Sequence, residues 1–262
     1  MLRFTSCMAA NSDAVCHQIA QYIGNRLSCP TEFVGDIPWQ AREQALDQGQ
    51  IQVGWICGLP YVRKADQALP MELLAAPLMQ GEHYQNQPVY FSDVVVRRDS
   101  PWQNFDQLQG TTWAYNEPGS HSGYYLTRYT LANRGKASGF FGQVIESGAH
   151  QKSLQLVLAG AVDASAIDST VLELELQRQP ELAAQIRIID RFGPSPIPPW
   201  VISTAVAPTL RSQLRQAFLE MHTDPEGRAI LAQGLIARFA AVTDADYDPI
   251  RQMAQQAEAV LL

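Results

Sequence analysis

Residues 2–34 read LRFTSCMAANSDAVCHQIAQYIGNRLSCPTEFV, and this stretch decides the fold class. Residues 2–8 predict one strand and residues 31–34 a second. Between them, Asn11 or Ser12 is expected to cap a helix whose apolar positions follow the 3.6-residue period. A strand, a helix and a strand in succession are typical of an α/β sheet covered by helices.

The alternation continues along the chain. A helix at 41–46 and a strand at 51–55 complete the first series, and Gly58 and Pro60 predict a turn at the carboxyl end of that strand, where ligands of open α/β sheets bind. A long strand is predicted at 89–97, and a second series then begins, with strands at 111–115, 143–146 and 162–167, helices at 120–133 and 150–158, and a following strand at 187–190. We expect each series to form a mostly parallel sheet flanked by helices.

A proline-rich segment returns the chain to the first series. Residues 193–199 read GPSPIPP, which excludes a helix because proline lacks the backbone N–H and constrains the residue before it. Two crossings, near 90–97 and 190–200, predict a first lobe of residues 1–92 and 195–262 and a second of residues 93–194. Such connections form a hinge, with a ligand cleft between the lobes.

Charge limits the possible partners. The 262 residues include 19 basic and 26 acidic side chains, which gives a net charge of −7. Because no basic stripe is present, we expect no nucleic acid partner. An acidic chain can still bind a small anion, since the backbone N–H groups at a helix N-terminus carry partial positive charge. We expect a monomer with a small anionic ligand and no cofactor.

The cysteines and the first residues bear on the compartment. Cys7, Cys16, Cys29 and Cys57 lack CxxC spacing and predict buried free thiols without a metal site, with a single disulfide as the alternative. The first residues show no signal segment, and no apolar run reaches the roughly 20 residues of a spanning helix. The sequence as written therefore predicts a soluble cytoplasmic chain, or a periplasmic one if a leader has been removed.

The motif Asn116-Glu117-Pro118-Gly119-Ser120-His121-Ser122-Gly123 follows a predicted strand and opens a predicted helix. Two hydroxyl groups and several backbone N–H groups would converge there on one anionic group. In the alternative interpretation, Ser120 is only the N-cap of the helix. The motif alone leaves both interpretations open.

Two further polar residues stand at predicted helix starts. His150 follows Gly148-Ala149 and can donate a ring N–H to an oxyanion, or serve as a surface or capping residue. Asp168 ends a strand and can cap the next helix, pair with a ligand ammonium, or accept a proton from an incompletely ionised oxyacid. In the first lobe Tyr61, Tyr90 and Ser6 lie near strand ends, where they can face a ligand or belong to the core.

The ordered set of motifs resembles the phosphate/phosphite/phosphonate-binding family of ABC-transporter substrate-binding proteins. The matching segments are Val53-Gly54-Trp55-Ile56-Cys57-Gly58-Leu59-Pro60-Tyr61, Tyr90 with Val94-Val95-Val96, Asp99-Ser100, Phe105-Asp106-Gln107-Leu108-Gln109-Gly110, Ser120-His121-Ser122-Gly123-Tyr124, Ser147-Gly148-Ala149-His150, Val162-Asp163-Ala164 and Ser195-Pro196-Ile197-Pro198. The resemblance implies the two-lobed α/β fold of type 2 periplasmic binding proteins, the venus flytrap.

The resemblance also implies roles for particular residues. Residues 120–122 and His150 would hold the oxygens of a phosphonate or phosphate. Tyr61 and Tyr90 would close over the ligand, and Asp168 would contact its substituent or a protonated oxygen. The family usually has threonine where this chain has His121, a difference that bears on specificity.

The implied function is ligand binding with lobe closure, read by an ABC permease or by a sensor partner chain. The alternative is an enzyme on the same fold, a lyase for a small carboxylated metabolite, with His150 or Asp168 as general base. Turnover that depends on His150 would identify the enzyme, and saturable binding of a phosphonate would identify the binding protein.

Overall fold

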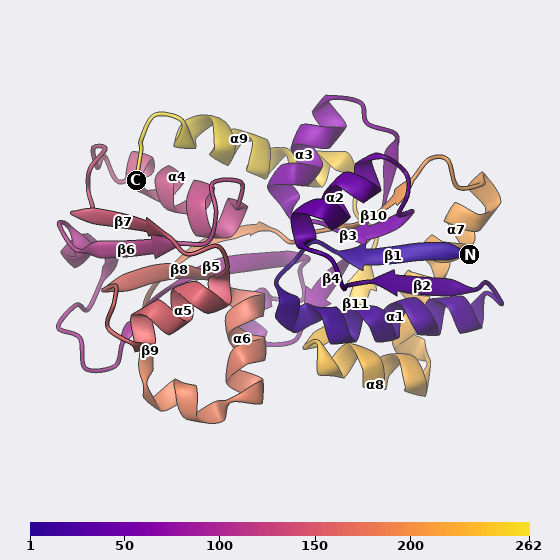
Figure 1. Cartoon of the computed structure of the whole chain (residues 1–262), viewed down its shortest axis with the longest axis horizontal. Helices are drawn as coiled ribbons and strands as arrows, with labels where there is room; N and C mark the ends of the chain where they lie inside the picture. Colours follow the sequence, from indigo (N-terminus) through magenta and orange to yellow (C-terminus); the bar gives the residue numbers. More distant parts are fainter. The chain divides into compact units, whose positions relative to one another are not determined.

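The computed structural model describes residues 1–262 and divides them into two compact units. Unit 1 consists of Met1–Val89 and Pro196–Asp248, and unit 2 of Tyr90–Ser195 and Pro249–Leu262. The two-unit α/β architecture expected from the sequence is confirmed, with one sheet in each unit (Figure 1). The chain passes between the units three times rather than twice, because the C-terminal segment packs with unit 2 and not with the first lobe, where the sequence analysis placed it.

Unit 1 is built on a six-stranded sheet of order β11-β4-β10-β3-β1-β2. Its elements are β1 Leu2–Ser6, α1 Asp13–Arg26, β2 Thr31–Val34, α2 Trp39–Asp47, β3 Val53–Trp55, α3 Gly58–Asp66, β4 Met71–Met79, β10 Trp200–Ser203, α7 Pro208–Glu220, α8 Pro225–Gln233 and β11 Ile236–Ala240. Helices α1, α7 and α8 contact one another or the sheet, and Figure 1 shows α2 and α3 on the other side of that sheet from α1 and α8.

Unit 2 has a five-stranded sheet of order β7-β6-β8-β5-β9. Its elements are β5 Val89–Arg97, β6 Thr112–Tyr115, a π-helical turn His121–Tyr125, α4 Leu126–Asn133, β7 Gln143–Glu146, α5 His150–Leu158, β8 Ala164–Asp168, α6 Ser169–Arg178, β9 Ile186–Pro196 and α9 Asp248–Ala257. Helix α9 begins at the last residue of unit 1 and belongs to unit 2 from Pro249 onward.

Both sheets are mixed, where the sequence analysis expected mostly parallel ones. In unit 1, β1 is parallel to β2 and β3, but β10 runs antiparallel to β3 and β4, and β11 antiparallel to β4. In unit 2, β6 is parallel to β7 and β8, whereas β5 is antiparallel to β8. Strand β5 follows β4, and β10 follows β9, without an intervening α-helix, so these connections are not crossovers of the βαβ kind.

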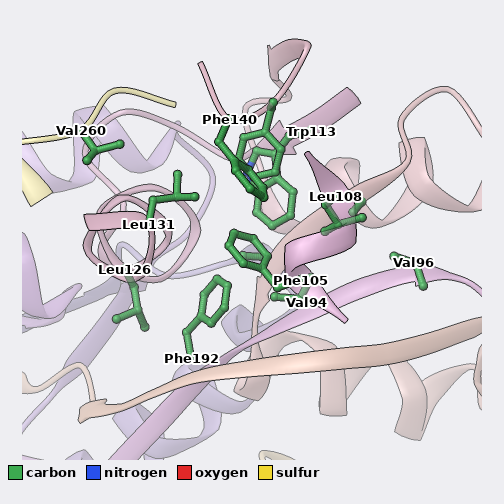
Figure 2. Close-up of a cluster of buried hydrophobic side chains, with 13 residues drawn as sticks. Val94, Val96, Phe105, Leu108, Trp113, Leu126, Leu131, Phe140, Phe192 and Val260 are labelled. Carbon is green, nitrogen blue, oxygen red and sulfur yellow. The ribbon is translucent and has the colours of Figure 1, made fainter. Parts of the chain in front are cut away.

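The sheet of unit 2 is covered by a separate apolar core on each face. One core gathers aromatic rings: Phe105 stacks on Phe140 with ring centroids 5.3 Å apart and meets Phe192 edge to face at 5.0 Å (Figure 2). Leu126 and Leu131 of α4 complete this core. The second core contains apolar residues of α5 and α6, namely Leu154, Val157 and Leu172. Rigid packing on both faces fixes the strand ends that carry the polar residues described below.

Several local expectations need correction. Gly58, where a turn was predicted, is instead the first residue of α3. The N-cap residue of this helix, Cys57, makes no side-chain capping bond. Ser12 precedes α1 but its hydroxyl donates to the carbonyl of Ala9 at 2.8 Å, so it does not cap the helix through its side chain. The cysteines are all free, as predicted, but only Cys16 is fully buried.

Candidate functional site

The turn between β6 and α4 carries the main candidate site. Ser120 has an extended backbone, and its Oγ accepts a hydrogen bond from the backbone N–H of Gly123 at 3.1 Å. The N–H of Tyr125 donates to the Ser120 carbonyl at 3.1 Å, a bond that spans five residues and defines the π-helical turn. The predicted helix 120–133 therefore begins with a π turn, a feature frequent at functional sites.

Gly123 allows the turn to pack closely. A Cβ atom at this position would overlap the side-chain oxygen of Asn116 and would lie 3.0 Å from Cε1 of His150. Asn116 follows β6, and His150 begins α5, so three segments meet at one backbone position. Only glycine leaves room for this approach.

Ser122 and His150 form a direct contact. Ser122 Oγ lies 3.1 Å from His150 Nε2, and both side chains are buried. The Ser122 carbonyl accepts a hydrogen bond from Ser92 Oγ of β5 at 2.8 Å. The serine is thus fixed from two sides, and one ring nitrogen of the histidine is held at the helix start.

His121 lies in a second buried polar contact. Its Nε2 atom is 3.0 Å from Ser195 Oγ of β9, and the Ser195 hydroxyl also donates to Sδ of Met253 at 3.5 Å. The ring of Tyr90 lies near the imidazole, with centroids 6.4 Å apart. The His121 side chain is fully buried, and its Nδ1 atom has no hydrogen-bond partner.

Burial keeps both histidines neutral. Loss of hydration lowers the pKa of His121 to about 4, and it lowers the pKa of His150 to about 4 as well. The backbone of Ala166 opposes the shift in the pKa of His150 to a smaller extent. The site at neutral pH therefore offers hydroxyl, imidazole and backbone N–H groups rather than a cationic side chain.

Asp168 ends β8 and caps α6. Its Oδ1 atom accepts from the backbone N–H of Thr170 at 2.9 Å and from its hydroxyl at 2.7 Å. Burial raises the pKa of the carboxyl group to about 6, with a small further increase from Asp93. Asp168 pairs with Ser92 in the β5–β8 register, and Ser92 bonds Ser122, so the carboxyl group lies on the strand next to the one that supports the helix start.

Tyr61 and Ser6 belong to unit 1, as predicted, whereas Tyr90, which was predicted in the first lobe, belongs to unit 2 because β5 carries it into the second sheet. Tyr61 lies in α3. Its hydroxyl donates to Oδ1 of Asp244 at 2.8 Å, and its ring meets the ring of Tyr247 edge to face, with centroids 4.8 Å apart. Ser6 ends β1, is fully buried and accepts at Oγ from the N–H of Met8 at 3.2 Å. The structure thus brings Tyr90, Ser120, His121, Ser122 and His150 together in unit 2, with Asp168 nearby, and places Tyr61 and Ser6 in unit 1.

Arg42 organises the loops around Ser6. It is buried, donates from Nη1 to the Ser6 carbonyl at 3.0 Å, and forms an ion pair with Asp13 at 2.9 Å. Its Nε atom donates to the carbonyl of Ile37 at 2.7 Å, and Nη2 donates to the carbonyl of Gly35. One guanidinium group therefore joins the ends of β1 and β2 to the start of α1.

Sequence reasoning missed three polar residues as members of the site: Ser92, Asn116 and Ser195. Ser92 interrupts an apolar strand, which was the available signal for a buried polar role. Asn116 and Ser195 stood inside segments already noted, but nothing local showed that they reach Gly123 and His121. No group of three or more His, Cys, Asp or Glu side chains is placed to hold a metal ion, and no helix combines the length and apolar character that a bilayer crossing needs.

The fold and the polar helix start are those of a two-lobed α/β ligand-binding protein. The family described as "ABC transporter, phosphonate, periplasmic substrate-binding protein" matches residues 9–247. The chain belongs to this family, as the sequence resemblance indicated. Because the family consists of transporter binding proteins, it favours binding over the enzyme alternative.

Individual relatives are distant in sequence. The chain is 23% identical over 216 residues to the phosphonates-binding periplasmic protein of Escherichia coli (strain K12), an alignment that covers 80% of this chain and 62% of that protein. The chain thus spans less than two thirds of the length of this curated relative.

Solved structures share the fold. PhnD1 from Prochlorococcus marinus (MIT 9301), in complex with methylphosphonate, superposes with a TM-score of 0.86 at 17% identity and covers 98% of both chains. A binding protein component of the ABC phosphonate transporter from Pseudomonas aeruginosa gives 0.84 at 18% identity, over 98% of this chain and 86% of that one. The aliphatic sulphonate binding protein SsuA from Escherichia coli gives 0.63 at 16% identity, over 97% and 85%. The fold by itself therefore does not select one oxyanion.

Proposed function

We propose that this chain binds a small phosphonate-type oxyanion at the β6–α4 turn and serves as the substrate-binding component of an ABC importer. The observation that carries the proposal is the convergence of Ser120, His121, Ser122 and His150 on one buried helix start. The family to which the chain belongs and the methylphosphonate complex of a protein with the same fold support the choice of ligand.

The chemistry of the site fits a buried anion. Hydrogen bonds to a charged group contribute more than bonds between neutral groups, about 1.5–3 kcal/mol each. The helix start adds backbone N–H groups and a favourable dipole. Because both histidines are neutral at physiological pH, recognition depends on hydrogen bonds, and moderate salt weakens it little.

The same proposal gives a role to each of the other candidate residues. Asp168 contacts the ligand's amino substituent or a protonated oxygen, and the ring of Tyr90 shapes the site beside His121. Tyr61 and Ser6 are assigned as ligand contacts supplied by unit 1. The partner is the permease and ATPase of an ABC transporter, the compartment is the periplasm, and the binding protein acts as a monomer.

Calorimetric titration with methylphosphonate tests the proposal. Replacement of both Ser120→Ala and Ser122→Ala removes two hydroxyl donors and is expected to weaken binding by about 100-fold or more. Ser165→Ala is the matched control, because Ser165 is a buried serine of β8 in the same unit whose hydroxyl has no partner. Unchanged binding by the double variant would refute the assignment of the site, and absence of binding by the unmodified chain to methylphosphonate, phosphite, phosphate and aminoethylphosphonate would refute the ligand class.

A further inference from the structure

The tautomer of His121 follows from the hydrogen bonds of Ser195. A serine hydroxyl has one hydrogen, and a thioether sulfur can only accept. With Nε2 protonated, the ring N–H donates to Ser195 Oγ at 3.0 Å and the Ser195 hydroxyl can donate to Sδ of Met253 at 3.5 Å, so this tautomer gives both hydrogens an acceptor. The Nε2 atom therefore carries the ring proton, and Nδ1 is a bare acceptor.

The opposite tautomer is less favourable in this surrounding. It would leave a protonated Nδ1 buried without an acceptor, and unpaired buried N–H groups are rarer than unpaired buried acceptors. Tyr90 of β5 and Ser195 of β9 lie against the ring, and Met253 of α9 lies against Ser195. No charged side chain contributes to the pKa of His121, which burial alone lowers.

We infer that His121 is a specificity residue whose Nδ1 atom accepts a hydrogen bond from a protonated ligand oxygen, so that the site selects the monoanion of a phosphorus oxyacid over a fully ionised oxyanion. This inference rests on the proposed function and narrows its ligand. A P–O–H group satisfies the buried acceptor, whereas a sulfonate or a phosphonate dianion places oxygen lone pairs against it. An acceptor left unpaired, or opposed by a second acceptor, weakens binding.

Methylphosphonate and methanesulfonate make a matched pair of probes. They have similar shapes, and the phosphonate monoanion has the same charge as the sulfonate, but only the phosphonate retains a hydroxyl group. For the unmodified protein we expect methanesulfonate to bind about tenfold more weakly or worse. We also expect the affinity for methylphosphonate to fall about tenfold per pH unit above the second pKa of the ligand, because only the monoanionic fraction is competent to bind.

Protein groups that change protonation with pH can also alter the affinity, so the pH experiment needs a control. The pKa of Asp168 is raised to about 6, and the pKa of His150 is lowered to about 4. The pH profile of methanesulfonate binding records these protein titrations without any ligand titration, and the same measurements in the Asp168→Asn variant remove the carboxyl group. The pH effect that remains for methylphosphonate belongs to the ligand proton.

Two variants separate the acceptor from the bulk of the ring. His121→Leu retains an apolar side chain of similar size without an acceptor and is expected to lose both the preference for methylphosphonate and the ligand-dependent pH effect. His121→Asn places an amide oxygen near the position of Nδ1 and is expected to retain a part of the preference. Equal discrimination by the unmodified protein and the leucine variant would overturn the inference, as would tighter binding of the methylphosphonate dianion.

The tautomer can be read without any ligand. Long-range proton–nitrogen correlation spectra, assigned with His121→Leu, are expected to show a protonated Nε2 and an unprotonated Nδ1 for His121. A protonated Nδ1 would overturn the inference even if phosphonates bind. If Nδ1 is unprotonated and no oxyacid binds, the proposed function fails while the tautomer assignment stands, so the two failures are distinguishable.

Discussion

The side chain of Asn116 occupies the space that a Cβ atom on Gly123 would require. Asn116 directly follows β6, and Gly123 lies inside the π-helical turn that comes next. This relationship holds the helix start against the sheet and sets the position of Ser120, whose Oγ accepts from the N–H of Gly123 at 3.1 Å. The geometry of the candidate site therefore depends on the absence of a side chain.

Gly123→Ala is expected to destabilise the chain by about 1–3 kcal/mol, because the new methyl group overlaps Asn116 and crowds His150. Urea denaturation measures the loss. Gly119→Ala is the matched control in the same turn, since a Cβ there would meet its nearest atom, Oε1 of Glu117, only at 4.0 Å. Equal effects of the two substitutions would contradict the steric explanation, and Asn116→Ala is expected to relieve part of the cost of Gly123→Ala.

The buried histidines predict a loss of stability in acid. Burial lowers the pKa of both His121 and His150 from 6.5 to about 4, so between these values the unfolded chain binds more protons than the folded one. Above pH 6.5 each neutral histidine makes its full contribution to the free energy of unfolding. This contribution falls by about 3 kcal/mol for each histidine as the pH falls toward 4. Denaturation of the unmodified chain and of His121→Leu across this range is expected to show a shallower pH dependence for the variant. An identical dependence would show that His121 is not buried in its neutral form.

Asp168 has the opposite pH dependence. Burial raises the pKa of its carboxyl group from 3.8 to about 6, so the folded state retains the proton over this interval, and the stability due to the protonated carboxyl is lost as the pH rises through 6. Asp168→Asn keeps an acceptor for Thr170 and is expected to raise the free energy of unfolding at pH 8 by about 1–3 kcal/mol, with little change at pH 4. Chemical denaturation at the two pH values measures the difference. A gain of equal size at both would contradict the role of the carboxyl charge.

Arg42 is expected to be intolerant of a shorter cation. Arg42→Lys retains the charge but cannot reach the carbonyls of Ser6, Gly35 and Ile37 together. We expect a loss of about 3–5 kcal/mol, measured by thermal or urea denaturation. Arg3→Lys is the control, since Arg3 forms an exposed ion pair with Glu32 and its replacement should cost about 0.5 kcal/mol or less. A small effect at Arg42 would show that the loops of unit 1 do not depend on the guanidinium network.

The sequence predicted elements whose pattern is local. Strands at 31–34, 89–97 and 143–146 and the helix at 150–158 have the bounds that periodicity indicated. Strand β4 was missed because Met71–Met79 lies between β10 and β11, is buried from Leu74 to Met79 and contains Pro77, so it shows no alternation. Local rules fail for such a strand because its neighbours, and not its own pattern, stabilise it.

In the candidate site, too, local features were predictable from the sequence and long-range contacts were not. Ser120 as N-cap and Asp168 as N-cap were alternatives open from the sequence, and both capping bonds are present. The ligand roles of these residues remain proposals that capping does not exclude. The partner of His121 could not be predicted, because Ser195 lies 74 positions away on β9.

By itself, the sequence determined the α/β class, most helix and strand positions and the family, since periodicity, caps and ordered motifs are properties of neighbouring residues. Only the tertiary structure decided the mixed sheets, the return of residues 249–262 to unit 2, and the contacts of His121, Ser122 and Gly123. The physical reason is that burial, hydrogen-bond direction and steric exclusion depend on groups that the fold brings together from distant parts of the chain.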